Sequence, residues 1–313
     1  MDTTHDQAYD QAYDQAHDQA HDRAHDQGTD MPHNTAAAHY DGTAAHSLRR
    51  TPLNAFHNDA KRALLRAFAA GAGSVLDVAC GRGGDVHKWI ALSIPHVTGL
   101  DVSSASVEEA RRRSSEALAR ARHTFTHTFV VADLLAPWPT AATTASFDVV
   151  TCMFALHYFF ATEASARAFL GNVAAALRPG GRFVGVVTDA RAVNECLARG
   201  RGDTYATEAV TLRARWHGTP QCFGSAYTCD VRGTVTEASA VPEYLVWDPV
   251  LTKVAALAGL VPLAIDLPDV VDPAPPGGAL HALRPPYDGP LAECSRLYAA
   301  FAFEKRQRGS STT

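Results

Sequence analysis

The 313-residue sequence contains no apolar run long enough to cross a lipid bilayer, and its first residues lack the basic-then-apolar pattern of a secretion signal. Cysteine is sparse. Its six residues are scattered, without a Cys-x-x-Cys pair or a repeated metal-ligand spacing, which favours reduced thiols over a disulfide framework. We therefore expect a soluble, intracellular protein with no membrane partner and no structural metal site.

Charge of one sign is concentrated at one end of the chain. Residues 1–44 carry nine Asp and one Arg, a net charge of −8, whereas the whole chain carries −5. Subtracting the first value from the second leaves about +3 on the remaining residues. The overall net charge gives no indication of a nucleic-acid partner. It is the sum of an acidic segment, residues 1–44, and a mildly basic remainder.

The acidic segment contains a repeat of four residues, HDQA-YDQA-YDQA-HDQA-HDRA-HDQG, from His5 to Gly28. The repeat has no aliphatic residue larger than alanine, so it buries too little surface to offset the entropy of ordering. We interpret residues 1–44 as a disordered tail. Metal binding by its clustered histidines is the alternative, although nothing in the repeat fixes a coordination geometry.

Residues 45–313 have the composition of a folded domain, in which buried strands alternate with amphipathic helices. This alternation predicts an α/β protein with a doubly wound, Rossmann-like sheet of seven mostly parallel strands. A partly β insertion is predicted at about residues 190–245, between the fifth and sixth strands. We expect helices at 53–69, from about 84, at 103–122, at 163–181 (ended by Pro-Gly-Gly) and after 247, a loop at 268–290, and a late strand at 295–306.

A glycine-rich loop follows the first strand, in the stretch SVLDVACGRGGDVHKW from Ser74 to Trp89. Glycines allow a tight turn and let a ligand approach the backbone, so the loop is typical of a nucleotide-like cofactor site. Its spacing fits the GxGxxG pattern of NAD sites poorly. Acids at three successive strand ends, namely Asp77, Asp101 and Asp133, favour S-adenosylmethionine over a dinucleotide, with Asp101 placed to accept ribose hydroxyls. The alternative is three ordinary aspartate caps.

Six segments of the sequence together resemble the mRNA cap guanine-N7 methyltransferase family, in the family's order and over roughly residues 39–305. They are LNAFHNDAKRALL, VLDVACGRGGDVHKW, FALHYFF, FGSAYTCDV, VPEYLVWDPVL and LYAAFAFEK. The resemblance implies an S-adenosylmethionine-dependent enzyme that methylates N7 of the terminal guanosine of capped RNA (GpppN). It also implies roles for particular residues.

On the cofactor side, the resemblance implies that Lys61 reaches the methionine carboxylate and that the backbone from Ala79 to Gly83 cradles the amino-acid part. Asp101 would hold the ribose, Asp133 the adenine, and Tyr158 would pack near the sulfonium. The complete cofactor set that the resemblance implies is Lys61, Asp77, Ala79, Gly81, Gly83, Asp101, Asp133, Met153 and Tyr158.

On the cap side, the implied set is His57, Asn58, Arg82, Lys88, Arg113, His157, Glu243 and Tyr298. The chemistry is consistent with these residue types. Cations suit the triphosphate bridge, a carboxylate accepts from guanine N–H groups, and aromatic faces favour the positive charge that methylation creates. The sequence alone leaves an alternative open at each of four positions: a core histidine at His157, an ordinary strand aromatic at Tyr298, and solvated helix charges at Lys88 and Arg113.

Some positions depart from the family pattern. Ala79 replaces the first glycine of the loop, Met153 replaces a glutamine that faces the cofactor, and His57 and Asp59 replace Asn and Trp in the entry helix. Ala79 and Met153 keep open the alternative of a non-catalytic cap-binding subunit. A small-molecule methyltransferase is a second alternative, because the fold alone would permit it.

Guanine N7 has a lone pair at neutral pH, so the implied reaction needs no general base and we expect none. The chain also lacks the Lys-x-Asp-Gly motif of guanylyltransferases. A separate guanylyltransferase and RNA triphosphatase are therefore expected partners. The expected location is the nucleus or, for a viral protein, the cytoplasm or virion.

Overall fold

The computed structural model describes residues 51–121, 125–139, 146–232, 234 and 241–306, so the repeat of the acidic tail lies outside the described residues. The helices are α3 (Pro52–Ala69), α4 (Val86–Ala91), α5 (Ser104–Leu118), η2 (Leu156–Phe159, 3-10), α6 (Glu163–Ala176), α7 (Ala190–Arg199), α8 (Asp248–Leu257) and α9 (Pro290–Ser295). In the part of the chain that is described, none of these helices is long and apolar enough to span a membrane.

The strands form two sheets. They are β1 (Ser74–Val78), β2 (His96–Asp101), β3 (Thr126–Val131), β4 (Phe147–Met153), β5 (Leu177–Thr188), β6 (Thr204–Ala206), β7 (Val210–Ala214), β8 (Ala226–Val231), β9 (Glu243–Tyr244), β10 (Leu260–Pro262), β11 (His281–Ala282) and β12 (Tyr298–Lys305). The main sheet has the order β10-β12-β5-β4-β1-β2-β3, with β11 added beside β12.

The main sheet is mostly parallel. Strands β1 to β5 pair in parallel with their neighbours, and β12 runs antiparallel to β5, β10 and β11. The predicted α/β, doubly wound architecture is therefore confirmed, with β11 as a short addition to the seven strands of the path. Because helices cover both faces, the central strands are buried on both sides, and β1 and β4 consist almost wholly of buried residues.

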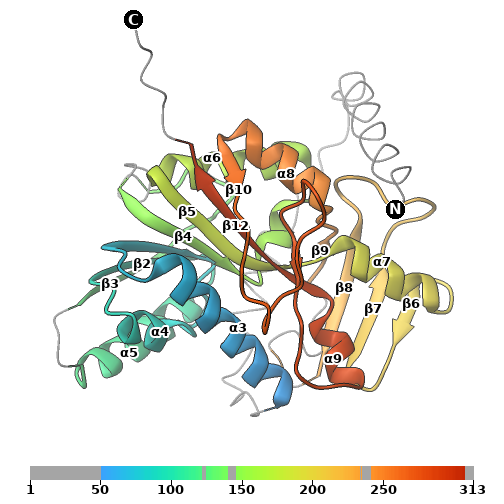
Figure 1. Ribbon diagram of the computed structural model, residues 1–313, viewed down its shortest axis with the longest axis horizontal. Helices are drawn as coiled ribbons and strands as arrows, with labels where there is room; N and C mark the ends of the chain where they lie inside the picture. The colour runs from blue at the N-terminus through green and yellow to red at the C-terminus, as the bar shows by residue number, and fades with distance from the viewer. Residues whose placement is uncertain (1–50, 122–124, 140–145, 233, 235–240, 307–313) are drawn as a thin grey trace, which may run out of the picture.

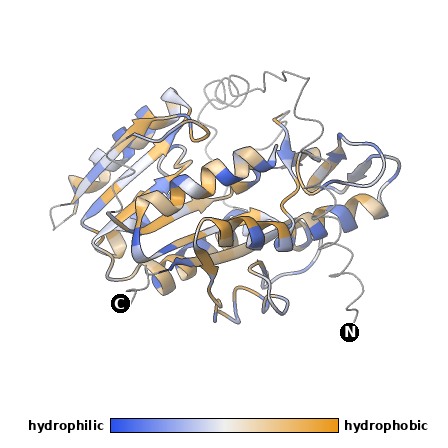
Figure 2. Cartoon of the chain, turned by 90° about the horizontal axis from the view of Figure 1, so that it is seen from above, coloured by the Kyte–Doolittle hydropathy of each residue, from blue (hydrophilic) through white to orange (hydrophobic). Residues whose placement is uncertain are grey.

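Helices cover the main sheet in two layers, with α3, α4 and α5 on one side and α6 and α8 on the other (Figure 1). Hydrophobic and hydrophilic residues alternate along the helices (Figure 2). Helix α3 begins where the Thr51 side chain accepts the Asn54 N–H, with Pro52 as its first residue. Its buried stripe includes Leu53, Phe56 and Leu64, at the spacing of one helix face.

The strand order reverses at β1. Strands β2 and β3 extend the sheet on one side of β1, and β4 and β5 extend it on the other. In doubly wound sheets the crevice for a ligand lies at such a point, beyond the carboxyl ends of the strands. The glycine-rich loop follows the carboxyl end of β1, so the fold places it at this crevice.

The segment after β5 forms a second, smaller unit, which lies at the α7 and β6 side of the molecule in Figure 1. Helix α7 leads into a four-stranded antiparallel sheet with the order β6-β7-β8-β9. The chain then returns through α8 to β10 of the main sheet. A partly β insertion between the fifth and sixth strands of the main sheet was predicted at about residues 190–245, and the structure has it there.

Some predicted boundaries were wrong. The helix expected at 163–181 ends at Ala176, and Leu177 already pairs with Phe147 as the first residue of β5. Proline at 179 disfavours a helical residue before it, which explains the early end. The loop expected at 268–290 contains β11, and the short helix α9 precedes a final strand that begins only at Tyr298.

Candidate functional site

The glycine-rich loop turns sharply through left-handed backbone conformations. Gly81 and Gly83 have φ angles of 51° and 69°, and Ala79 has a φ of 54° although it carries a Cβ. A Cβ on Gly83 would lie 3.1 Å from Ala110 of α5, so this glycine lets the loop pack closely against the helix. A Cβ on Gly81 would meet nothing within 4 Å. Ligand can therefore approach the backbone at Gly81.

Asp101, the last residue of β2, is buried against the loop. Its Oδ2 accepts the Gly81 N–H at 2.8 Å, and its Oδ1 accepts the Ser103 N–H at 2.9 Å. The predicted ribose ligand therefore also fixes the turn of the glycine loop. Each carboxylate oxygen has a second lone pair that can accept a further donor.

The other two strand-end acids differ in their surroundings. Asp77 is buried within β1 and accepts the Thr151 hydroxyl at 2.8 Å. Burial first, and the charge of Asp85 second, raise the pKa of Asp77 to about 7. Asp133 is exposed two residues beyond β3, and its Oδ1 accepts the Leu135 N–H. The geometry of Asp133 is that of an aspartate cap, whereas Asp77 and Asp101 flank the loop.

A buried cluster of charges joins α3 to α4. Lys61 donates to Asp85 Oδ2 at 2.9 Å, and the Lys88 ammonium lies 2.7 Å from Asp85 Oδ1. Lys88 also donates to Asn58 Oδ1 at 2.9 Å and to the Gly84 carbonyl at 3.3 Å. Burial raises the pKa of the Asp85 carboxyl, but the two lysines outweigh it and hold that pKa below its ordinary value. Asp85, which sequence reasoning missed, therefore contacts two predicted site residues, Lys61 and Lys88, and Lys88 in turn holds a third, Asn58.

An aromatic cluster lies beside these charges. His57 packs its ring 5.0 Å from the Phe154 ring centroid and 5.2 Å from that of Tyr298, and Phe154 and Tyr298 meet edge to face at 5.1 Å. Burial, followed by the charge of Lys61, lowers the pKa of His57 to about 3. The Lys61 ammonium lies 5.9 Å from the Phe154 centroid. These contacts link the predicted cofactor lysine to two predicted cap residues.

Phe154 was not among the predicted site residues. It directly follows Met153, the last residue of β4, and has a φ of 62°, which is unusual for a bulky side chain. Strained backbone of this kind concentrates at functional sites. The sequence signal was its position in the FALHYFF segment, one residue after the site residue Met153.

A buried chain of polar groups connects the main sheet to the insertion. The His157 Nδ1 lies 3.4 Å from Thr188 Oγ1, which lies 2.7 Å from the Tyr227 hydroxyl. The Tyr227 hydroxyl donates to Glu243 Oε2 at 2.8 Å, and His157 Nε2 lies 3.8 Å from Glu243 Oε1. Sequence reasoning named His157 and Glu243 but missed Thr188 and Tyr227. The tyrosine belongs to the FGSAYTCDV segment, which was the available signal.

Burial sets the charges of this network. It raises the pKa of Glu243 to about 7, although the Tyr227 hydrogen bond opposes the shift, and it lowers the pKa of His157 to about 3. In the tautomer whose Nδ1 proton is donated to Thr188 Oγ1, neutral His157 presents Nε2 as an acceptor. In the described part of the chain this buried Nε2 has no hydrogen-bond partner. In that tautomer, and with Glu243 ionised, the network presents two acceptors 3.8 Å apart, Nε2 of His157 and Oε1 of Glu243.

The remaining predicted residues are divided between the site and the surface. Tyr158 packs its ring 4.3 Å from that of His157, and Met153 is buried at the end of β4. Arg82 is half-buried in the glycine loop. Arg113 forms an ion pair with Glu109 of its own helix at 2.6 Å. The arrangement thus joins the cofactor residues to most of the cap residues, while the contacts of Arg113 stay within α5.

The architecture is that of methyltransferases. A methyltransferase from Clostridium acetobutylicum, described as S-adenosylmethionine-dependent, aligns with a TM-score of 0.51 at 14% identity, covering 88% of this chain and 99% of that one. The CcbJ methyltransferase from Streptomyces caelestis gives 0.51 at 15% identity, with 87% and 96% covered. At these identities the likeness concerns the fold.

The family follows from the sequence. Residues 24–263 match the mRNA (guanine-N(7))-methyltransferase domain, and this chain belongs to that family. Curated relatives named mRNA cap guanine-N(7) methyltransferase include one from Caenorhabditis elegans at 32% identity over 56% of this chain and 48% of that protein. Another, from Cryptococcus neoformans, is 30% identical over 81% of this chain and 38% of that protein. The chain thus spans about half or less of the length of these relatives.

Proposed function

We propose that this chain is an enzyme that transfers a methyl group from S-adenosylmethionine to N7 of the terminal guanosine of capped mRNA. The observation that carries the proposal is the joining, at one edge of the sheet, of a glycine-loop site and the paired acceptors His157 and Glu243. Family membership and the methyltransferase fold support it.

The residues at the glycine loop fit the cofactor. S-adenosylmethionine, when bound, supplies an electrophilic methyl group on a positively charged sulfur. The loop offers open backbone at Gly81, and the buried Asp101 carboxylate at the end of β2 suits ribose hydroxyls. Lys61 is the cation placed for the methionine carboxylate. In the structure Lys61 forms an ion pair with Asp85. With the cofactor bound, the Lys61 ammonium would therefore contact both the Asp85 carboxylate and the methionine carboxylate.

The cap guanine fits the paired acceptors. Its N1–H and N2–H₂ edge presents donors, and His157 Nε2 and Glu243 Oε1 lie 3.8 Å apart as two acceptors. The Tyr227 hydroxyl donates to the other oxygen of Glu243 and so fixes the carboxylate. Binding through this edge leaves N7, on the opposite side of the purine, open to the methyl donor.

No residue needs to act as a general base in this reaction, because N7 attacks through its own lone pair. Catalysis would depend on holding the nitrogen, the methyl carbon and the sulfur in line, and such orientation is worth roughly 7–11 kcal/mol. Aromatic faces at Tyr158 and Phe154 would tolerate the positive charge as it moves from sulfur to purine.

The substrate implies further proteins. We propose that a guanylyltransferase, acting after an RNA triphosphatase, makes the GpppN end that this chain methylates. Because this chain spans about half or less of the length of the relatives named above, we propose the methyl transfer and these partners for the 313-residue chain itself.

Two measurements test the proposal against its alternatives. Calorimetry with S-adenosylhomocysteine should show binding that is weakened by Asp101→Ala, whereas a non-catalytic cap-binding subunit would bind none. A panel with labelled S-adenosylmethionine should show transfer to GpppG and capped RNA, but not to uncapped RNA of the same sequence. Transfer to a small molecule in place of capped RNA would overturn the assignment.

A further inference from the structure

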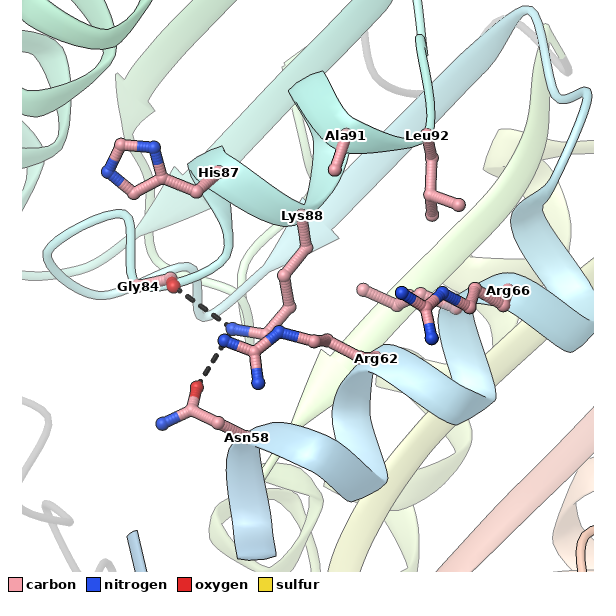
Figure 3. Close-up of a pocket in the computed structure, with 9 residues that line it drawn as sticks. Asn58, Arg62, Arg66, Gly84, His87, Lys88, Ala91 and Leu92 are labelled. Carbon is pink, nitrogen blue, oxygen red and sulfur yellow. Dashed lines mark hydrogen bonds between the residues drawn. The ribbon is translucent and has the colours of Figure 1, made fainter. Parts of the chain in front are cut away.

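We propose that the groove between α3 and α4 binds the phosphate backbone of the transcript beyond the cap. The groove is a surface pocket of ≈ 280 Å³ whose lining includes Asn58, Arg62, Arg66, His87 and Lys88 (Figure 3). This inference rests on the proposed function, since it assumes that the cap itself is bound at the neighbouring site.

One wall of the groove is a row of polar side chains on α3. Asn58, Arg62 and Arg66 recur at every fourth residue, so they share one face of the helix. Eight residues of helix span about 12 Å, which is long enough to contact more than one phosphate of a single strand. The opposite wall is α4, where Lys88 points toward Asn58 and Arg62 (Figure 3).

The cations of this wall are available to a ligand. Arg62 pairs at 2.6 Å with Asp59, but both side chains are about half or more exposed, at 49% and 69%. Exposed pairs of this kind contribute about 0–1 kcal/mol, so the guanidinium can exchange its partner for a phosphate. Arg66 is exposed and forms no ion pair within the described ranges. Lys88, in contrast, is committed to Asp85 and Asn58.

The position of the groove identifies its ligand. Asn58 and Lys88, which line one end, belong to the predicted cap-side residues, and Lys88 is one of the cations expected at the triphosphate. Lys88 also donates to the Gly84 carbonyl of the loop. A transcript bound by its cap has phosphates attached directly after the triphosphate. Arginines suit phosphate because their guanidinium groups match its geometry. A row of them that starts at the triphosphate position therefore fits the nucleotides that follow the cap.

The test compares two substrates that differ only in the RNA attached to the cap. The Arg62→Glu/Arg66→Glu variant should raise KM about tenfold for capped RNA of about 20 nucleotides and leave KM for the GpppG dinucleotide unchanged. The slope of log affinity against log salt for RNA should become shallower by about 1.4, because each single-strand phosphate contact contributes about 0.7.

Matched variants separate the groove from general effects. Arg62→Lys/Arg66→Lys keeps the charge and should keep most of the affinity for RNA. Arg191→Glu/Arg306→Glu makes the same charge change at two other exposed arginines and should leave both substrates unaffected. Thermal unfolding of each variant verifies that the fold is intact.

The outcomes distinguish this inference from the proposed function. Fluorescence anisotropy with uncapped RNA of the same length reports on the groove without any methylation. One outcome would be that binding of uncapped RNA weakens in the Arg62→Glu/Arg66→Glu variant while neither the native protein nor the variant methylates capped RNA. That outcome would support RNA binding in the groove and contradict the proposed function. Equal effects on GpppG and capped RNA, or none on either, overturn the groove. Faster turnover of both substrates in the variant would identify an inhibitory acidic segment as the occupant, which also overturns it.

Discussion

Ala79 is the residue at which the sequence departs from the family pattern most directly, and its backbone shows why the family has glycine there. Its φ of 54° lies in the left-handed region. This backbone conformation costs a residue with a Cβ roughly 1–2 kcal/mol. The neighbouring turn residues Gly81 and Gly83 adopt such angles without that cost. The methyl group therefore strains the loop itself, beside any effect on the cofactor.

Replacing Ala79 with glycine should relieve this strain. We expect Ala79→Gly to raise the free energy of unfolding by about 0.5–1 kcal/mol, since relief of strain exceeds the added entropy of the unfolded chain. Ala67→Gly, at an exposed position inside α3, should lower it by about 1 kcal/mol. Denaturant unfolding measures both, and a loss of stability in Ala79→Gly would contradict this reading of the loop.

Tyr227 acts on the proposed cap site through its hydrogen bond to Glu243. Its hydrogen bond lowers the carboxyl pKa against the rise caused by burial. Tyr227→Phe should therefore raise the pKa of Glu243 further above 7 and move the acidic limb of the pH–rate profile to higher pH. We expect kcat/KM for capped RNA to fall at pH 6.5 and to recover toward pH 8.5.

The control for this prediction is Tyr205→Phe, on β6, which should leave the pH profile in place. If Tyr227→Phe lowered turnover equally at every pH, the tyrosine would serve packing alone. A shift of the profile toward lower pH would reverse the assigned direction and contradict the role.

Residues whose chemistry is local could be predicted from the sequence, and residues that act through long-range contacts could not. The glycine loop and Asp101 follow directly from a strand–turn–helix pattern. Tyr227 faces Glu243 because β8 and β9 of the insertion pair with these two residues in register, and it contacts Thr188 only because the insertion folds back onto β5 of the main sheet. No spacing rule predicts that contact, although the motif around Tyr227 was visible.

At the scale of elements, α3 connects the glycine-rich loop, where we propose that the cofactor binds, to the proposed cap residues. Its Lys61 forms a buried pair with Asp85 of the loop, with side-chain exposures of 15% and 7%, while its neighbour Arg62 forms an exposed pair with Asp59. The helix thus offers a buried and an exposed ion pair one residue apart. The two should differ greatly in their effect on stability.

We predict that Lys61→Met lowers the free energy of unfolding by about 2–3 kcal/mol, because Asp85 then keeps only Lys88 as a buried counter-charge. Arg62→Gln should change it by at most about 0.5 kcal/mol. Urea titration of both variants measures the contrast. Equal losses would show that the buried pair does not hold α3 to the loop.

Elements with strong periodicity could be predicted, and short ones could not. Helix α3 and strand β1 lie close to the ranges that their patterns predicted. The six-residue helix α9 was missed because a Pro- and Gly-rich stretch reads as a loop, and its helical geometry depends on packing against α3. The end of α6 was misplaced because pairing with β4 competes with helix continuation at Leu177.

At the scale of the whole molecule, the site lowers stability in favour of function. Glu243 has a pKa of about 7 in the folded protein against an ordinary value of 4.5. The folded state therefore binds more protons than the unfolded state between these values, and stability is lost as pH rises from about 4.5 to 7. Above pH 7 the molecule carries a buried carboxylate charge at Glu243, which the proposed binding of guanine N–H donors uses.

Removing that charge should stabilise the protein and inactivate it. We predict that Glu243→Gln raises the free energy of unfolding by about 3 kcal/mol at pH 8 and by almost nothing at pH 5, while methylation of capped RNA is lost. Thermal unfolding at the two pH values measures the difference. If the difference in stability between the variant and the native protein were the same at pH 5 and pH 8, the ionised carboxylate would not be destabilising.

The main sheet, the glycine loop and the insertion meet at one edge, and the account depends on a methyl donor and a cap guanine being bound there together. The most direct test is to locate the methyl group after the reaction. Capped RNA is incubated with labelled S-adenosylmethionine and the chain, digested with nuclease, and the products are separated. The account predicts that the label is found on N7 of the terminal guanosine, in m7GpppN. Label on another atom of the RNA, or no label in the RNA while the cofactor binds, would contradict it.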